Sequence, residues 1–316
     1  MIGLRTFLAG MLLTTGGAYA EEFPVTVTDA RAAQVTIDQE PQRVVALGAF
    51  ASDVLTALGK EPVGITTYEG ERPVYLGKDL GPATDLGDLT APNLELMATL
   101  NPDLVVGMLR YNGPYEEEIT EIADFLAFDI GGIDVSDKNI ISLGTALGQS
   151  EKALKLNETF AGLRANFEEQ TGKQDVSYLF IWNFYDSMYA YQDNLMSAEL
   201  LSGLGATNLA GFNEDAETPD QAVKVLEVED LLALDPDVLL MFSSHGSTIK
   251  GSAALKRLKA VKEGRAFSVG FQYSQPDGPI AREMVLREAA SLLFPGLFQA
   301  PALPENARAT VLKFAD

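Results

Sequence analysis

The residues best suited to binding chemistry are aromatic and cationic side chains that follow expected β-strands in both halves of the chain. In the first half they are Phe50, Tyr68, Arg72, Arg110 and Tyr111, and in the second half Trp182, Phe184, Tyr185, Tyr189, His245, Phe271 and Tyr273. Aromatic rings offer area for stacking, and arginine donates paired hydrogen bonds to carboxylate-like groups. Any one of these residues could equally pack in a core. As a set, they favour a cleft for a flat or bulky, partly anionic ligand.

The sequence offers little support for catalysis. Gly203-Leu-Gly205 is followed by Asn208, where a dinucleotide-binding loop needs its third glycine, and neither a G-x-x-x-x-G-K-[ST] loop nor a G-x-S-x-G elbow occurs. His245 is the only histidine and cysteine is absent, which excludes metal sites built from several imidazoles or thiolates. Carboxylate pairs stay open among the 45 acidic residues, so an exported hydrolase is an alternative without a supporting motif. We therefore expect a binding protein, not an enzyme, with no resident cofactor and no directly bound metal.

The formal net charge of −22 at pH 7 argues against nucleic-acid binding, because contact with phosphates needs basic patches. Such acidity is consistent with high solubility, including in a salty habitat, and equally with docking onto a basic partner. Charge alone does not decide between these interpretations.

Residues 1–20 have the pattern of a secretory signal peptide. Arg5 precedes a mostly apolar run from Thr6 to Leu13, and Ala18-Tyr19-Ala20 provides a cleavage site. A lipoprotein would need a cysteine at the cleavage point, and no later apolar run reaches the length of about 18 residues that a membrane span requires. We expect export, cleavage after Ala20 and a mature protein that is free in the periplasm and does not span the membrane.

Expected strands and helices alternate on both sides of one long helix, from Ser150 to Thr171, which predicts two α/β lobes. One side of this helix carries the apolar residues Ala153, Leu156, Phe160, Leu163 and Phe167. We predict two Rossmann-like lobes with mainly parallel sheets, bridged by this single helix. Their bounds are 21–149 for the N-terminal lobe, 150–171 for the connecting helix and 172–316 for the C-terminal lobe. The apolar stripe should pack along both lobes.

An internal repeat supports this organisation. Residues 95–106 and 229–240 share glutamate, leucine, proline and aspartate at identical positions, and each reads as a helix that ends in a Pro-Asp turn before an apolar strand. A weaker match pairs residues 53–59 with 199–205. Two matches in the same order on either side of the long helix favour duplication over chance similarity. Helices are also expected over residues 114–126 and 305–314.

The chain resembles the periplasmic substrate-binding proteins of ABC importers, in the class that carries ferric siderophores, haem and cobalamin. The stretches that carry the resemblance are residues 41–47, 53–64, 93–106, 143–153 and 229–240. The resemblance implies two lobes that close over a ligand by a small motion. We also expect a monomer. The resemblance also implies that Glu95 and Glu229, one on each lobe, dock onto arginines of the permease dimer in the inner membrane.

The ligand that the resemblance implies is a ferric siderophore, with the iron held by the chelator. Catecholate binders of this class use arginine and tyrosine, and Arg110 and Tyr273 lie where such residues are expected. Residues 191–196 lack an arginine that some relatives have, which leaves hydroxamate or citrate-like chelates open. No clear haem signature is present, although Tyr189 or Tyr273 could be an axial ligand. A scaffold protein without a transport role is a further alternative.

Overall fold

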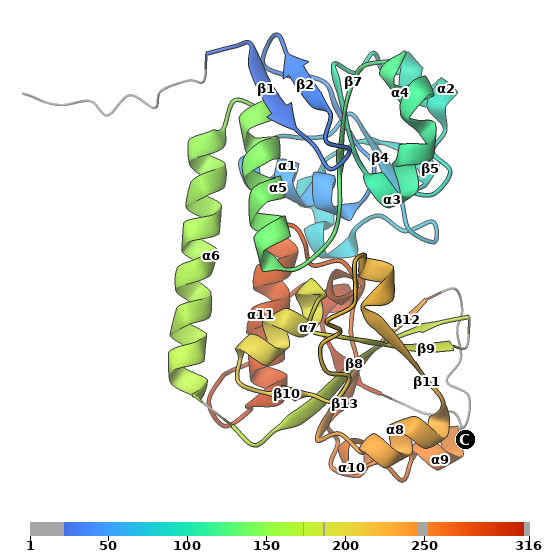
Figure 1. The fold of residues 1–316 in the computed structure, drawn as a ribbon, viewed down its shortest axis with the longest axis vertical. Coiled ribbons are helices and arrows are strands. Elements are labelled where there is room, and N and C mark those ends of the chain that lie inside the picture. Colours follow the sequence, from blue (N-terminus) through green and yellow to red (C-terminus); the bar gives the residue numbers. More distant parts are fainter. Residues whose placement is uncertain (1–21, 173, 186, 245–251, 313–316) are drawn as a thin grey trace, which may run out of the picture.

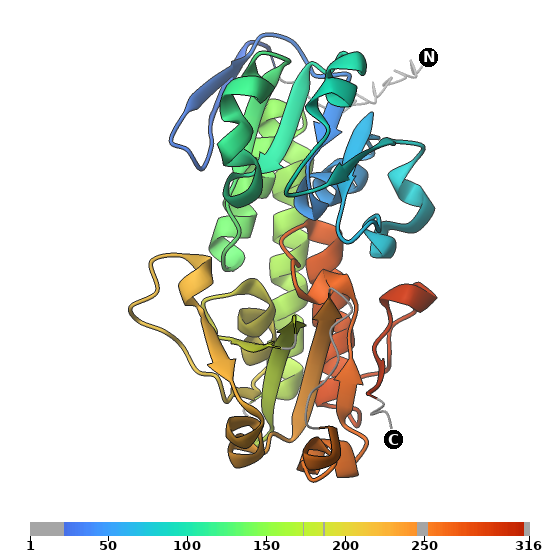
Figure 2. The ribbon, with the colours of Figure 1, turned by 90° about the vertical axis from the view of Figure 1, so that its right-hand side faces the viewer.

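A computed structural model describes residues 22–172, 174–185, 187–244 and 252–312. The expected signal peptide and His245 lie outside the described residues. The described chain forms two α/β lobes that are stacked along the long axis, with helix α6 (Ser150–Thr171) running beside both (Figures 1 and 2). The predicted α/β architecture is confirmed.

The sheet of the N-terminal lobe is parallel throughout, in the order β5-β4-β3-β6-β7. Its strands are β3 (Val44–Ala46), β4 (Gly64–Thr67), β5 (Thr84–Asp88), β6 (Leu104–Met108) and β7 (Asp124–Phe128). Helices α1 (Ala49–Leu58) and α5 (Ile133–Ala146) cover one face, and α2 (Leu94–Thr99) and α4 (Glu116–Thr120) the other. Val44 and Ala46 pack on the first face and Val45 on the second, so this continuous apolar run is buried on both sides, as expected for a parallel sheet.

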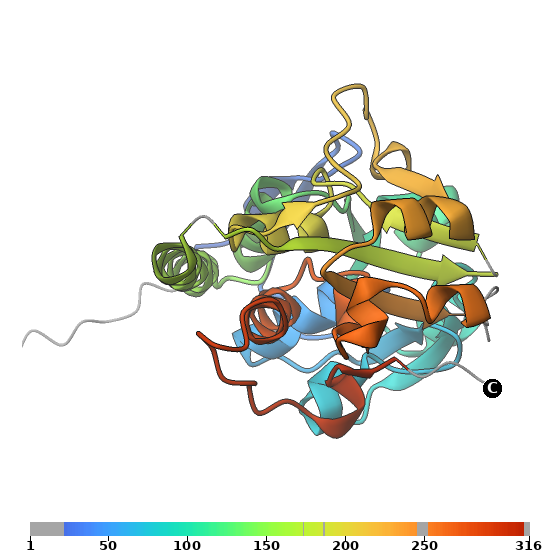
Figure 3. The ribbon, with the colours of Figure 1, turned by 90° about the horizontal axis from the view of Figure 1, so that it is seen from below.

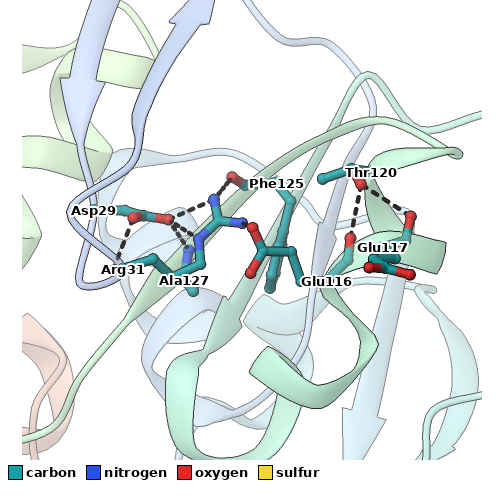
Figure 4. A network of polar contacts seen from close by, with 7 residues as sticks. All are labelled: Asp29, Arg31, Glu116, Glu117, Thr120, Phe125 and Ala127. Carbon is teal, nitrogen blue, oxygen red and sulfur yellow. Dashed lines mark hydrogen bonds and ion pairs between the residues drawn. The ribbon is translucent and has the colours of Figure 1, made fainter.

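An antiparallel hairpin precedes this sheet, formed by β1 (Val25–Thr28) and β2 (Gln34–Ile37). Arg31 in its turn ties it to the lobe (Figure 4). The Arg31 guanidinium donates to Asp29 and to the Phe125 carbonyl, each at 2.6 Å, and pairs with Glu116 at 2.8 Å. The Asp29 carboxylate also accepts a hydrogen bond from Ala127 N at 3.0 Å. One largely buried cation thus fixes the hairpin against β7 and α4.

The sheet of the C-terminal lobe is parallel at its centre and antiparallel toward its edges, in the order β11-β9-β8-β12-β13-β14, with β10 paired to β8. Its strands are β8 (Ser177–Phe184), β9 (Ser187–Tyr191), β10 (Thr207–Asn208), β11 (Val223–Leu226), β12 (Val238–Ser244), β13 (Ala266–Ser268) and β14 (Thr310–Val311). Helices α7 (Met196–Gly203) and α11 (Pro279–Leu293) cover one face, and α8 (Val228–Leu234), α9 (Ser252–Leu255) and α10 (Lys259–Lys262) the other.

Helix α6 begins and ends at the predicted residues and spans roughly 33 Å. Ala153 and Leu156 pack with the N-terminal core, whereas Phe160 and Phe167 pack with the C-terminal core. The apolar stripe therefore lies along both lobes, as predicted. Viewed from below, α6 and α11 are both seen end-on (Figure 3), so α11 runs roughly parallel to α6.

Two buried charged residues attach α11 to helices of the N-terminal half. The Asp53 carboxylate of α1 accepts hydrogen bonds from Ile280 N and Ala281 N at the start of α11, each at 2.8 Å. Burial nevertheless raises the pKa of Asp53 to about 6, because desolvation outweighs these bonds. Arg282, one residue further along α11, is fully buried.

The Arg282 guanidinium reaches two further helices. It donates to Asp137 at 2.6 Å and Ser136 Oγ at 3.2 Å on α5, and to Asn157 Oδ1 at 2.7 Å on α6. Its plane lies 4.2 Å from the centroid of the Phe160 ring. These contacts fix the position of α11 relative to α5 and α6.

The expected helix at residues 114–126 is only partly confirmed, and the one expected at residues 305–314 is wrong. The first stretch contains a short turn, Gly113–Tyr115, then α4, and it enters β7 at Asp124. Phe125 and Leu126 pack into opposite cores, as the alternation of side chains along a strand requires. The second stretch is a turn, Glu305–Ala307, followed by β14 at the edge of the sheet.

Candidate ligand-binding site

A cavity of about 420 Å³ lies between the two lobes. Residues after the carboxyl ends of the N-terminal strands form one wall, including Tyr68 after β4, Arg110 and Tyr111 after β6, and Gly131 after β7. The opposite wall comes from β8, β9 and β11 and from the loop before α11. Ligands of open α/β sheets bind at such strand ends, so this cavity is the candidate site.

Helix α3 (Leu109–Asn112) presents Arg110 and Tyr111 to the cavity. The buried Asn112 amide holds this turn, since its Oδ1 accepts from Met108 N at 2.9 Å and its Nδ2 donates to the Leu89 carbonyl at 3.0 Å. The Arg110 guanidinium lies 5.2 Å from the centroid of the Tyr111 ring. The cation is thus stacked on an aromatic face, a geometry that favours guanidinium groups.

Four aromatic residues of β8 and β9 form a continuous wall. Trp182 is paired directly with Tyr189 in the antiparallel register, and the period of two places Phe184 and Tyr191 on the same face. The Trp182 ring lies 4.6 Å from that of Phe184 and 5.8 Å from that of Tyr189, between centroids. Trp182 Nε1 donates to Ser244 Oγ on β12 at 2.8 Å. The indole is therefore fixed by a hydrogen bond while its face remains available to a ligand.

Tyr68 makes an aromatic contact between the lobes. Its ring stacks on that of Phe271 with 5.0 Å between centroids, and Phe271 belongs to the turn that follows β13. Burial raises the pKa of Tyr68 to about 12, with the Ser244 hydroxyl partly opposing this effect. The phenol therefore stays neutral at physiological pH and can donate a hydrogen bond to a ligand oxygen.

Two carboxylates also line the cavity. Asp277, which is 4% exposed, accepts a hydrogen bond from Gly131 N at 3.4 Å across the lobes. Burial raises the pKa of Asp277 to about 7, and the nearby Asp53 carboxylate acts in the same direction. At the end of β5, the Asp88 carboxylate accepts from Thr90 N at 2.9 Å and from Thr90 Oγ1 at 2.6 Å. The site thus combines aromatic walls with groups of both charges.

The raised pKa of Asp277 predicts a pH-dependent stability. Between pH 4 and pH 7 the folded chain binds a proton at Asp277 that the unfolded chain has released, so the free energy of unfolding falls as the pH rises. The variant Asp277→Asn has no carboxyl group to ionise at this position, so its free energy of unfolding does not fall in this way. At pH 8 the variant should exceed the wild type by roughly 2–4 kcal/mol, with little difference at pH 4. Urea unfolding at pH 4 to 8 measures the free energy of unfolding of both proteins. A difference between them that is constant across this range would contradict the raised pKa of Asp277.

The structure brings together six of the predicted site residues at the cavity, namely Tyr68, Arg110, Tyr111, Trp182, Phe184 and Tyr189. Other predicted residues lie away from it. Tyr185 is 65% exposed at the tip of the β8–β9 hairpin, Arg72 donates to the Gly81 carbonyl at 3.1 Å, and Phe271 packs behind Tyr68. His245 lies outside the described residues.

Phe50 and Tyr273 require a correction, because both are core residues and neither lines the cavity. Phe50 on α1 packs edge-on against Phe128, with 5.5 Å between ring centroids. Tyr273 is completely buried, and both this burial and the adjacent Glu288 carboxylate raise its pKa well above the usual range. Neither side chain can reach a ligand in this arrangement.

Tyr191, Asp88 and Asp277 also line the cavity and were not predicted from the sequence. Tyr191 could have been found, because it follows Tyr189 by two residues in a strand and so shares its face. Asp88 closes an edge strand whose sequence, TDLGD, has no strand-like pattern. Asp277 reaches the cavity only through packing between the lobes. Within the described residues, no group of three histidine, cysteine or acidic side chains could hold a metal ion.

A family model described as periplasmic binding protein matches residues 44–273, most of the chain. The chain belongs to the periplasmic binding protein family. Among curated relatives, the putative ABC transporter substrate-binding lipoprotein YhfQ of Bacillus subtilis (strain 168) is 26% identical over 84% of this chain and 87% of its own length. The Fe(3+) dicitrate-binding periplasmic protein FecB of Escherichia coli (strain K12) is 25% identical over 75% and 77%, respectively.

Solved structures share the fold of this family member. The petrobactin-binding protein YclQ from Bacillus subtilis superposes with a TM-score of 0.73 at 18% identity, over 86% of this chain and 99% of that one. The siderophore-binding protein BauB, solved with acinetobactin and ferric iron, gives 0.71 at 20% identity over the same shares. The resemblance to the periplasmic substrate-binding proteins of ABC importers is therefore confirmed. No helix in the described parts of the chain combines the length and hydrophobicity needed to cross a membrane.

Proposed function

We propose that this periplasmic binding protein captures a ferric siderophore between its lobes and delivers it to an ABC importer of the inner membrane. The observation that carries the proposal is the aromatic-walled cavity of about 420 Å³ between two lobes of this family's fold. Its size lies within the usual range for small-molecule sites. The relatives named for ferric dicitrate and for ferric acinetobactin support an iron chelate as the ligand class.

Capture depends on shape and stacking, with the iron coordinated by the chelator. Trp182, Tyr189 and Tyr111 offer ring faces, which supply large contact areas at a small cost in side-chain entropy. Arg110 offers paired donors to ligand oxygens. Because α6 and the Arg282 contacts tie the lobes together, we expect closure over the ligand to be small.

Delivery uses Glu95 on α2 and Glu229 on α8. Both are exposed, and their helices lie on opposite lobes, on the side of the molecule away from α6 (Figure 1). Neither is needed to begin its helix, because the Asn93 side chain caps α2, and Glu227 and Asp230 form the capping box of α8. A matched pair of anions suits a two-fold permease with arginines on its surface. We propose that a monomer, released into the periplasm, docks in this way.

Titration of the purified protein with ferric hydroxamate, catecholate and citrate chelates tests the proposed function. Trp182, the only tryptophan, should change its fluorescence on binding. Tyr189→Ala should lower the affinity about tenfold, because it removes a stacking ring. Phe212→Ala removes an aromatic side chain that is 61% exposed outside the cavity and should leave the affinity unchanged. Binding of haem or cobalamin with no response to the three iron chelates would contradict the proposal.

A further inference from the structure

The charges that line the cavity are unusual for a receptor of anionic chelates. Among its described lining residues Arg110 is the single cation, whereas Asp88 and Asp277 are both acidic. The remaining polar groups are mainly phenols and hydroxyls. The described lining therefore carries a net charge of −1 when both carboxyls are ionised, and no net charge when one of them is protonated.

The burial of these charged groups makes the carboxylates count for more than Arg110. Arg110 is exposed, so solvent screens its attraction for a ligand. Asp277 is 4% exposed, where interactions between charges are much stronger than in water. Asp53 lies completely buried nearby and interacts with Asp277, which adds to the negative potential at the bottom of the cavity. The buried Arg282 does not compensate fully, because it is paired with Asp137.

Ferric chelates differ sharply in charge. Three hydroxamates, each with a single negative charge, neutralise ferric iron, and an added amine makes the complex cationic. Three catecholates leave the complex trianionic, and ferric dicitrate is also anionic. Burying several negative charges beside two carboxylates and one cation carries a large desolvation cost that this lining does not offset.

We infer that the cavity selects ferric chelates without net negative charge, of the trihydroxamate class, and that Asp88 and Asp277 determine this specificity by repelling anionic chelates. The inference rests on the proposed function. The neutral hydroxyl of Tyr68 can donate to hydroxamate oxygens, and the aromatic wall at Trp182 and Tyr189 provides apolar contact for the methylene chains of such chelates. Specificity then arises from an unfavourable contact with the wrong ligand as much as from attraction to the right one.

The test compares four probes at pH 8 and low salt: a linear ferric trihydroxamate with a free amine, its N-acetylated form, ferric dicitrate and a ferric tris-catecholate. The two trihydroxamates should bind at least about tenfold more tightly than the two anionic chelates. In the double variant Asp88→Asn/Asp277→Asn, which keeps one acceptor oxygen at each position, the ratio between these affinities should fall about tenfold. Circular dichroism establishes that the variant is folded.

Glu169→Gln serves as the matched control, because it removes a negative charge from the exposed surface of α6 and should leave the ratio unchanged. Tighter binding of either anionic chelate by the wild type overturns the inference while the proposed function stands. An unchanged ratio in the folded double variant also overturns it. Failure of all four probes to bind contradicts the proposed function itself.

Discussion

Arg282→Ala is expected to lower the free energy of unfolding by about 3–5 kcal/mol, the range for removing one partner from a buried ion pair. The guanidinium is fully buried and donates to Ser136, Asp137 and Asn157, so truncation leaves acceptors on two helices without their donor. It also removes the stacking contact with Phe160. Urea unfolding followed by circular dichroism measures the loss.

Comparing the stabilities of several variants at Arg282 separates the contribution of its charged hydrogen bonds from that of its packing. Lysine cannot reproduce a planar fork that serves several acceptors, so Arg282→Lys should recover little of the stability. Methionine fills more of the volume of the arginine side chain than alanine does. Asp137, whose side chain is 34% exposed, can turn to solvent when its partner is removed. Arg282→Met should therefore lower the free energy of unfolding less than Arg282→Ala.

Arg287 supplies the control on the same helix. Its ion pair with Glu283 is exposed by 43% at both ends, and such surface pairs contribute little. Arg287→Ala should change the free energy of unfolding by less than about 0.5 kcal/mol. If Arg282→Ala costs no more than Arg287→Ala, the buried network does not hold the lobes in the way described.

The parts of the fold that could be predicted are those with a strong local pattern. Helix α6 was predicted to the residue because its apolar positions repeat with the helical period over 22 residues and Gly172 follows its end. The repeated segments at residues 95–106 and 229–240 likewise appear as α2–β6 and α8–β12. In contrast, residues 114–126 suit a helix locally, and the strand β7 forms there because the two cores need Phe125 and Leu126 on opposite faces.

The candidate site was predictable only where strand position alone brings a residue to the cavity. Trp182 and Tyr189 follow from the alternation along β8 and β9. Tyr273 has the same residue type and a similar place after a strand, but its turn directs the ring into the core. Asp277 depends on contacts between segments more than 140 positions apart in sequence, which no local pattern encodes.

The double variant Glu95→Lys/Glu229→Lys should reduce iron uptake in cells roughly tenfold or more, with the affinity of the purified protein for its ligand unchanged. The two helices lie on opposite lobes of the same side of the molecule (Figures 1 and 2), so each reversal would place a cation against a permease arginine. Repulsion between like charges lowers the rate of productive encounter, and two contacts act together in orienting the cavity. Either single variant should reduce uptake only a few-fold, because an exposed pair contributes little alone.

The matched control reverses two glutamates on α6, in Glu151→Lys/Glu169→Lys, which changes the net charge by the same amount on a different side of the molecule. If uptake depended on overall acidity, both double variants would be equally impaired. If it depends on docking through α2 and α8, only Glu95→Lys/Glu229→Lys should lose uptake, and higher salt in a reconstituted transport assay should narrow the difference. Normal uptake by Glu95→Lys/Glu229→Lys would show that these glutamates do not engage the permease, whatever the cavity binds.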